Sequence, residues 1–170
     1  MRSVFSWTKP SRGIIKINVD ATMGHSYSVL AVVVRDLRGD LIFACSNKAN
    51  TYSPLQTKDR ALRWAISLAD QMNSSAITIE GDCQMCLNVV SKHCQEVSWR
   101  IKTITQETIV ALESLPNPTV CLVPKKANMA AHTLVRWSLL NNFVGSFNVT
   151  NCPPCFSNVI KLEANFLFVI

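Results

Sequence analysis

The stretch from Ile14 to Asp20, which reads IIKINVD, decides the fold. Apolar side chains at every second position from Ile15 onward alternate with polar ones, which is typical of a β-strand with two different faces. Residues 76–82, AITIEGD, repeat this pattern and also end in Asp. If the two strands lie side by side and parallel, Asp20 and Asp82 meet at the carboxyl edge of the sheet, where open α/β sheets bind ligands. Two carboxylates at one edge suit a divalent metal ion.

Length and composition indicate one globular α/β domain. The chain has 170 residues, 48% of them hydrophobic, which is enough to bury a sizeable core. Its 17 Lys and Arg against 11 Asp and Glu give a net charge of +6, which is compatible with a phosphate backbone as partner. The basic residues are scattered, with no run longer than Lys125–Lys126, so an ordinary solvated surface explains them equally well.

The sequence has no recognisable segment for secretion or membrane insertion. No stretch near the start has the layout of a secretion signal, and no apolar run reaches about 18 residues. We therefore expect an intracellular chain, nuclear or cytoplasmic, that is monomeric and has no membrane partner. The seven cysteines are expected to be mostly small buried hydrophobes. The pairs Cys83/Cys86 and Cys152/Cys155 have zinc-ligand spacing, but they lie farther apart than paired zinc knuckles usually do.

Three strands at the start are followed by alternating helices and strands. The run 29–34 is dense in β-branched residues and is typical of a buried strand, and turn residues at 36–39 join it to a third strand at 41–45. Another short strand is predicted at 119–123. Helices are predicted from Ser53-Pro54 to about Met72, from Asp82 to about Lys92, from Ser98 to about Leu115, and from Asn128 to about Asn141.

Six segments carry a resemblance to a known family. They are WTKP at 7–10, GIIKINVDA at 13–21, VVRDLRG at 33–39, SPL at 53–55, IEGDCQ at 79–84 and VPKKANMAAHTL at 123–134. In their order and spacing the chain resembles the ribonuclease H type 1 domain, and more closely its plant branch, described as reverse-transcriptase-like or retroelement-derived.

The resemblance implies an RNase H-like fold. We expect a mixed five-stranded sheet whose first three strands are antiparallel, with helices on both faces. Residues 7–145 would form this domain. Residues 146–170 would be a C-terminal appendage, with a short helix and an apolar tail after position 156.

The resemblance also implies an activity and a metal site. Members of the family hydrolyse the RNA strand of an RNA–DNA hybrid with two Mg²⁺ ions, held by four carboxylates in the order Asp, Glu, Asp, Asp. Paired metals activate the attacking water and stabilise the leaving oxygen. Carried over, the first carboxylate is Asp20 and the third is Asp82, the expected ligands for Mg²⁺ or Mn²⁺. The second position holds Lys58 and the fourth holds His132.

These two replacements argue against metal-dependent cleavage. An ammonium group at Lys58 would neutralise the charge that holds the metal, unless its side chain points outward into solvent. An imidazole at His132 can bind Mn²⁺ or Zn²⁺ but is a poor ligand for Mg²⁺, and it can equally be an ordinary polar helix residue. A one-residue shift of the helix would instead bring Asp59 into the site.

Contacts to nucleic acid are expected from Lys125, Lys126 and Asn128 at the start of the last helix, whose free N–H groups favour phosphate. Trp99 and Arg100 are further candidates. The sequence thus predicts a ribonuclease H type 1-like protein that binds RNA–DNA hybrid or duplex, with weakened or absent cleavage. The alternative is a non-catalytic protein-interaction or structural remnant of a retroelement, with the segment after Gly145 as a docking segment.

Overall fold

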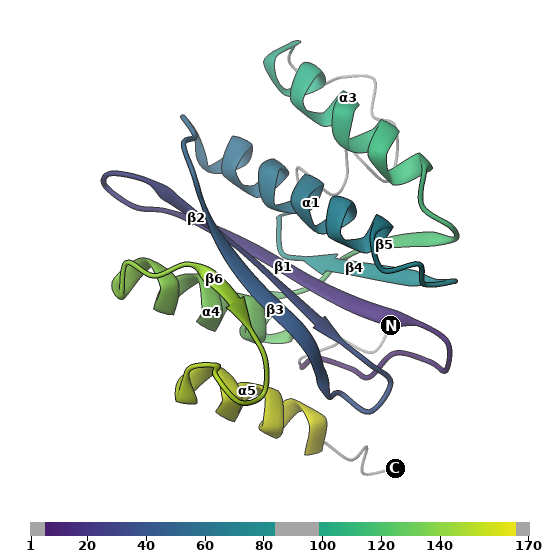
Figure 1. The fold of residues 1–170 in the computed structure, drawn as a ribbon. Helices are drawn as coiled ribbons and strands as arrows, with labels where there is room; N and C mark the ends of the chain where they lie inside the picture. Colours follow the sequence, from purple (N-terminus) through teal and green to yellow (C-terminus); the bar gives the residue numbers. More distant parts are fainter. Residues whose placement is uncertain (1–5, 84–98, 166–170) are drawn as a thin grey trace.

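The computed structural model describes residues 6–83 and 99–165, apart from the side chains of residues 99–104 (Figure 1). The strands are β1 (Ile15–Met23), β2 (Ser28–Arg35), β3 (Leu41–Ala49), β4 (Ile77–Gly81), β5 (Pro118–Leu122) and β6 (Gly145–Phe147). The helices are α1 (Pro54–Asp70), α3 (Trp99–Glu113), the short η1 (Lys125–Ala127), α4 (Met129–Leu140) and α5 (Pro154–Asn165).

The strands form one mixed sheet in the order β5-β4-β1-β2-β3-β6. β1, β2 and β3 are antiparallel neighbours, whereas β4 and β5 run parallel to β1 and to each other. The predicted fold class and the antiparallel opening are confirmed. The predicted strand count is wrong, because β6 adds a sixth strand beside β3. β6 has only three residues, too few to show a period in the sequence.

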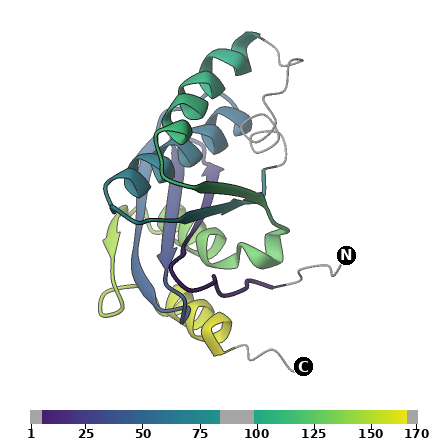
Figure 2. The same ribbon diagram turned by 90° about the vertical axis from the view of Figure 1, so that its right-hand side faces the viewer.

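Helices cover both faces of the sheet, as predicted (Figures 1 and 2). All eight residues of β2 are buried, as expected from its β-branched run. Alternate β2 residues face opposite sides. Val32 and Val34 pack in the cluster that contains α1, and Val29, Ala31 and Val33 pack in the cluster that contains α4 and α5. The sheet therefore lies between two separate apolar cores.

Helix α1 begins where the sequence predicts. Ser53 is the N-cap, its hydroxyl accepts a hydrogen bond from the Gln56 amide at 3.2 Å, and Pro54 takes the first helical position. Ala61 and Ala65 are fully buried on the face turned to the sheet. Because these side chains are small, the helix axis can approach the sheet closely. The residue one turn before Ala61 on this side is Lys58.

The other predicted helices are placed as follows. α3 and α4 begin and end within two residues of the predicted bounds, and the short helix predicted after position 156 is α5. The helix predicted from Asp82 to about Lys92 falls almost wholly outside the described residues. In the described parts of the chain, no helix is both long enough and apolar enough to cross a membrane.

The segment after Gly145 packs on the rest of the chain. Phe156 of α5 is fully buried in the core beneath α4. Glu163 of α5 forms an ion pair with Arg35 of β2, whose side chain is completely buried and whose guanidinium carbon lies 3.6 Å from the centre of the Trp7 ring. Burial lowers the pKa of Arg35 and raises the pKa of Glu163, and their mutual attraction offsets part of both shifts. The domain boundary predicted at residue 145 stays a prediction.

Candidate functional site

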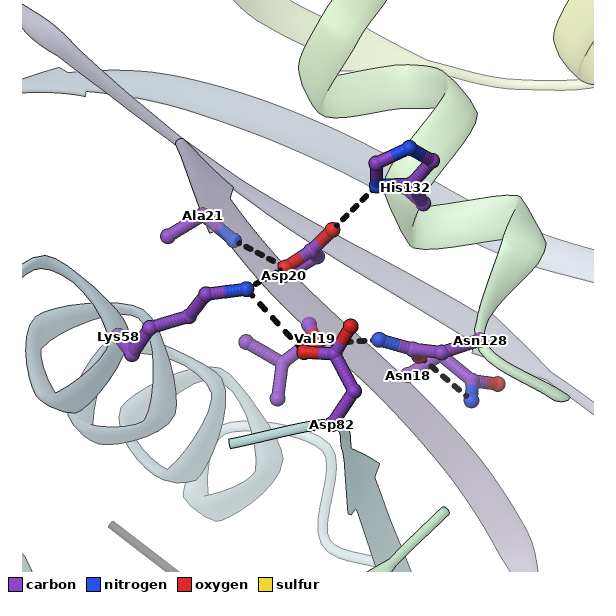
Figure 3. A network of polar contacts seen from close by, with 8 residues as sticks. All are labelled: Asn18, Val19, Asp20, Ala21, Lys58, Asp82, Asn128 and His132. Carbon is purple, nitrogen blue, oxygen red and sulfur yellow. Dashed lines mark hydrogen bonds and ion pairs between the residues drawn. The ribbon is translucent and has the colours of Figure 1, made fainter. Parts of the chain in front are cut away.

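The four side chains at the predicted site positions come together at the carboxyl ends of β1 and β4 (Figure 3). The parallel register pairs Asn18 with Glu80, so two residues further along each strand Asp20 and Asp82 leave the sheet side by side. Lys58 reaches them from the second turn of α1. His132 reaches Asp20 from the first turn of α4.

Lys58 joins the two carboxylates. Its Nζ donates hydrogen bonds to Oδ1 of Asp20 and, at 3.1 Å, to Oδ1 of Asp82. The alternative in which Lys58 points outward is therefore wrong. Burial acts to lower the pKa of Lys58, but the attraction of Asp20 and then of Asp82 outweighs it and leaves the pKa raised. The site thus contains a firmly held positive charge.

Asp20 is bound within the chain through both of its carboxylate oxygens. Its side chain is 2% exposed. Oδ1 accepts from the Ala21 amide at 2.8 Å as well as from Lys58, and Oδ2 lies 3.0 Å from Nδ1 of His132. Both oxygens of Asp20, the more buried of the two site carboxylates, therefore have protein partners. A metal ion at this place would compete with Lys58 and His132 for these oxygens.

Asp59 does not belong to this group. Its side chain is buried and faces α3, where Oδ1 accepts a hydrogen bond from Thr108 Oγ1 at 3.2 Å. Burial raises the pKa of Asp59 to about 6, an effect that Thr108 and Arg63 reduce and Glu107 reinforces. Adjacent helical residues point about 100° apart, so Asp59 cannot share the direction of Lys58. The alternative in which Asp59 supplies the missing carboxylate is wrong.

The side chain of Asn128 does not face solvent. Its side chain is fully buried, where Nδ2 donates to the Val19 carbonyl at 2.9 Å and Oδ1 accepts from Asn18 at 3.1 Å. The side chain makes no capping bond to α4. Asn128 is the N-cap residue of α4, as predicted, but its side chain is buried, so the predicted nucleic-acid contact from it is wrong. Asn128 instead fastens the start of α4 to β1, and this sets where His132 meets Asp20.

A buried polar network that sequence reasoning missed lies beneath the site. Asn18 donates to Glu80 at 3.0 Å and accepts from Arg35 at 2.8 Å, while Lys16 pairs with Glu80 at 2.8 Å. Polar residues at 16, 18 and 20 in a central strand were the available signal, because buried polar groups need partners. One partner of Asn18, Asn128, lies 110 positions away.

The two lysines that the sequence predicts as nucleic-acid contacts are exposed to solvent. Lys125 and Lys126 form the exposed start of η1. The Val123 amide donates to the Gly81 carbonyl at 2.9 Å, which fastens this segment to the residue just before Asp82. The side chains of Trp99 and Arg100 lie outside the described residues.

The donor set does not fit Mg²⁺ while Lys58 stays in place. Within the described residues there is no group of three or more His, Cys, Asp or Glu side chains that could hold a metal. The pocket beside Asp20, Lys58 and Asp82 has a volume of about 20 Å³, about the room of one water. Of the two cysteine pairs, Cys86 lies outside the described residues, and Cys152 and Cys155 are free thiols.

Comparison with known proteins identifies a family that matches this chain. A model of the family described as reverse transcriptase-like matches residues 18–138, which include all four site positions. None of the curated protein sequences compared with the chain matches it.

Several solved structures have the same fold. RNase H1 from the halophilic archaeon Halobacterium salinarum has a TM-score of 0.68 at 14% identity, covering 76% of this chain and 99% of that one. The N-terminal RNase H domain of a Mycobacterium tuberculosis protein has a TM-score of 0.66 at 11% identity, covering 75% and 94%. LC11-RNase H1, in complex with an RNA/DNA hybrid, has a TM-score of 0.65 at 16% identity, covering 75% and 98%. At such identities the likeness shows the fold alone.

Proposed function

Because the chain belongs to the reverse transcriptase-like family, whose model matches residues 18–138, we propose that it is an RNase H-like nucleic-acid-binding protein without metal-dependent cleavage. The partner is an RNA–DNA hybrid or a related duplex. LC11-RNase H1, one of the proteins of the same fold, is in complex with such a hybrid, which supports this partner class. The plant, retroelement-derived branch stays a prediction from the sequence.

The observation that carries the proposed loss of cleavage is the contact of Lys58 with both Asp20 and Asp82. In-line hydrolysis at phosphorus with two metals needs several anionic oxygens free to bind them. Here an ammonium group takes one oxygen from each carboxylate. His132 takes the other oxygen of Asp20, at 3.0 Å. Restoring a metal centre would require removal of the charge at 58 and addition of carboxylates.

The basic turn supports nucleic acid as the partner. Lys125 and Lys126 are exposed in the turn that precedes α4, and lysine side chains are frequent contacts of phosphate groups. Their segment is fastened beside Asp82 by the bond between Val123 and Gly81. A nucleic-acid strand whose backbone is bound by these two lysines would pass close to the site formed by Asp20 and Lys58.

Cleavage is tested with a labelled RNA–DNA hybrid in Mg²⁺ and separately in Mn²⁺. We expect no cleavage by the wild-type chain, and a gain of cleavage in the double variant Lys58→Glu, His132→Asp. Each single variant and Asp20→Asn in the double background are the controls. Mg²⁺-dependent cleavage by the wild type that Asp20→Asn abolishes would overturn the proposed loss.

Binding is tested separately by titrating the protein into the same hybrid at increasing salt. Phosphate contacts release counterions, so the affinity should fall steeply as salt rises. Lys125→Ala together with Lys126→Ala should reduce both the affinity and the salt slope, the slope by about one for each lysine that touches a phosphate. No binding at low salt would overturn the nucleic-acid function and favour the alternative, a protein-interaction or structural remnant.

A further inference from the structure

The charge at the site differs in a definite way from that of a bare carboxylate site. Asp20 and Asp82 together carry two negative charges, and the ammonium group of Lys58 compensates one of them at hydrogen-bond distance. Two unpaired carboxylates would repel a phosphate group that approached them. Cations bound at a site that consists of carboxylates alone therefore favour the approach of a nucleic-acid backbone.

We propose that Lys58 replaces the divalent cation as the permanent counter-charge of this site, so that the chain binds a nucleic-acid duplex equally well with and without Mg²⁺. The inference rests on the proposed nucleic-acid function and adds how that binding is controlled. In this proposal Lys58 makes binding of the duplex independent of Mg²⁺. The proposed loss of cleavage, in contrast, concerns only hydrolysis.

The structure gives Lys58 the rigidity that this role needs. Its helix is capped by Ser53 and lies against the sheet through the buried small residues Ala61 and Ala65. The side chain is 26% exposed, and its ammonium group is held by both carboxylates. An ammonium group held in this way is present without any loading step and is not removed by a chelator.

The pocket beside Lys58 is small. The pocket lined by Asp20, Lys58, Leu62, Asp82 and neighbouring residues holds about 20 Å³, the room of one water. Mg²⁺ keeps several of its waters when it binds a protein. Lys58 already binds one oxygen of each carboxylate, so a Mg²⁺ ion that approached the pair would meet a fixed positive charge, and Mg²⁺ in solution should alter little the charge that a phosphate meets.

The experiment measures binding of a short labelled RNA–DNA hybrid by fluorescence anisotropy, in EDTA and in millimolar Mg²⁺ at equal ionic strength. The wild-type dissociation constant should agree between the two buffers within about twofold, since only general screening differs. Lys58→Met should weaken binding about tenfold in EDTA, because it exposes both carboxylates, and Mg²⁺ should restore part of the loss. Lys58→Arg keeps the charge and should bind nearly as the wild type does.

Lys161→Met is the matched control. It removes the same charge from an exposed position of α5, and it should change neither the affinity nor the effect of Mg²⁺ beyond what the lower net charge produces. Circular dichroism checks that each variant is folded. Should Lys58→Met fail to fold, calorimetric titration of Mg²⁺ into the wild type without nucleic acid decides the question, and heat of binding at the site would overturn the inference.

The outcomes separate the inference from the function on which it rests. Wild-type binding that needs Mg²⁺ and disappears in EDTA would overturn the metal independence and leave the nucleic-acid function standing. Equal losses for Lys58→Met and Lys161→Met would overturn the special role of Lys58. Absence of binding in both buffers would overturn the proposed function, and the inference with it.

Discussion

Asp59 offers the sharpest quantitative prediction. Its carboxylate is 2% exposed, one oxygen accepts from Thr108, and the other has no hydrogen-bond partner among the described residues. Burial raises the pKa of Asp59 from its ordinary 3.8 to about 6. At about 1.4 kcal/mol per pKa unit, keeping this group charged costs the folded state roughly 3 kcal/mol above pH 6.

The direction in which stability changes with pH follows from proton binding by Asp59. The folded chain holds the Asp59 proton more tightly than the unfolded chain does, so the favourable contribution is complete below pH 3.8 and is lost as the pH rises through about 6. Asp59→Asn removes the charge and keeps an oxygen for Thr108. We expect the variant to be more stable than the wild type at pH 8 by about 1 to 3 kcal/mol, because the new amide hydrogens lack a partner and reduce the full gain.

Urea unfolding at pH 5 and pH 8 measures this effect. The advantage of Asp59→Asn should be about 1.4 kcal/mol smaller at pH 5, where the folded wild type already carries the proton. Asp70→Asn, at an exposed position of the same helix, is the control and should change stability by less than about 0.5 kcal/mol at either pH. A variant less stable than the wild type at pH 8, or an advantage independent of pH, would refute the reasoning.

Three further predictions concern the packing around the site. Glu163→Gln leaves the buried guanidinium of Arg35 without its counter-charge and should lower the free energy of unfolding by about 3 kcal/mol in urea; a loss under about 1 kcal/mol would contradict this role. Gly39→Ala and Gly13→Ala both place Ala at positive φ, +85° and +83°, but only at position 39 does the new Cβ lie 3.0 Å from the α5 backbone. Gly39→Ala should therefore cost about 1 to 3 kcal/mol more than its control, and equal losses in thermal unfolding would exclude the close approach. Asn128→Ala should cost about 1 to 3 kcal/mol and shift the His132 imidazole signals in NMR spectra, and unchanged signals would contradict its positioning role.

Several features of the site follow from local sequence patterns. The alternation in residues 14–20 and 76–82 predicts two strands, and their parallel pairing brings Asp20 and Asp82 to one edge. Helical spacing from Ala61 puts Lys58 on the face turned to the sheet. These inferences succeed because strand and helix periods are properties of neighbouring residues.

Other features depend on partners that are distant in the sequence. Asn128 looks like a helix cap because Asn is common there, but its amide bonds to Val19 and Asn18 instead. β6 has no period of its own and becomes a strand only because β3 offers it a free edge. No local pattern could pair Arg35 with Glu163, which lies 128 residues further along the chain.

By itself the sequence determined the strands and helices apart from β6 and the undescribed residues after position 83, the family resemblance, and the four residue types at the site positions. Only the tertiary structure decided that Lys58 binds both carboxylates rather than solvent, and that Asp59 faces α3. The physical reason is that periodicity gives the direction in which a side chain leaves its own helix or strand. Its charge and hydrogen-bond partners come from elements folded against it, and a buried polar group takes whichever partner the packing brings within reach.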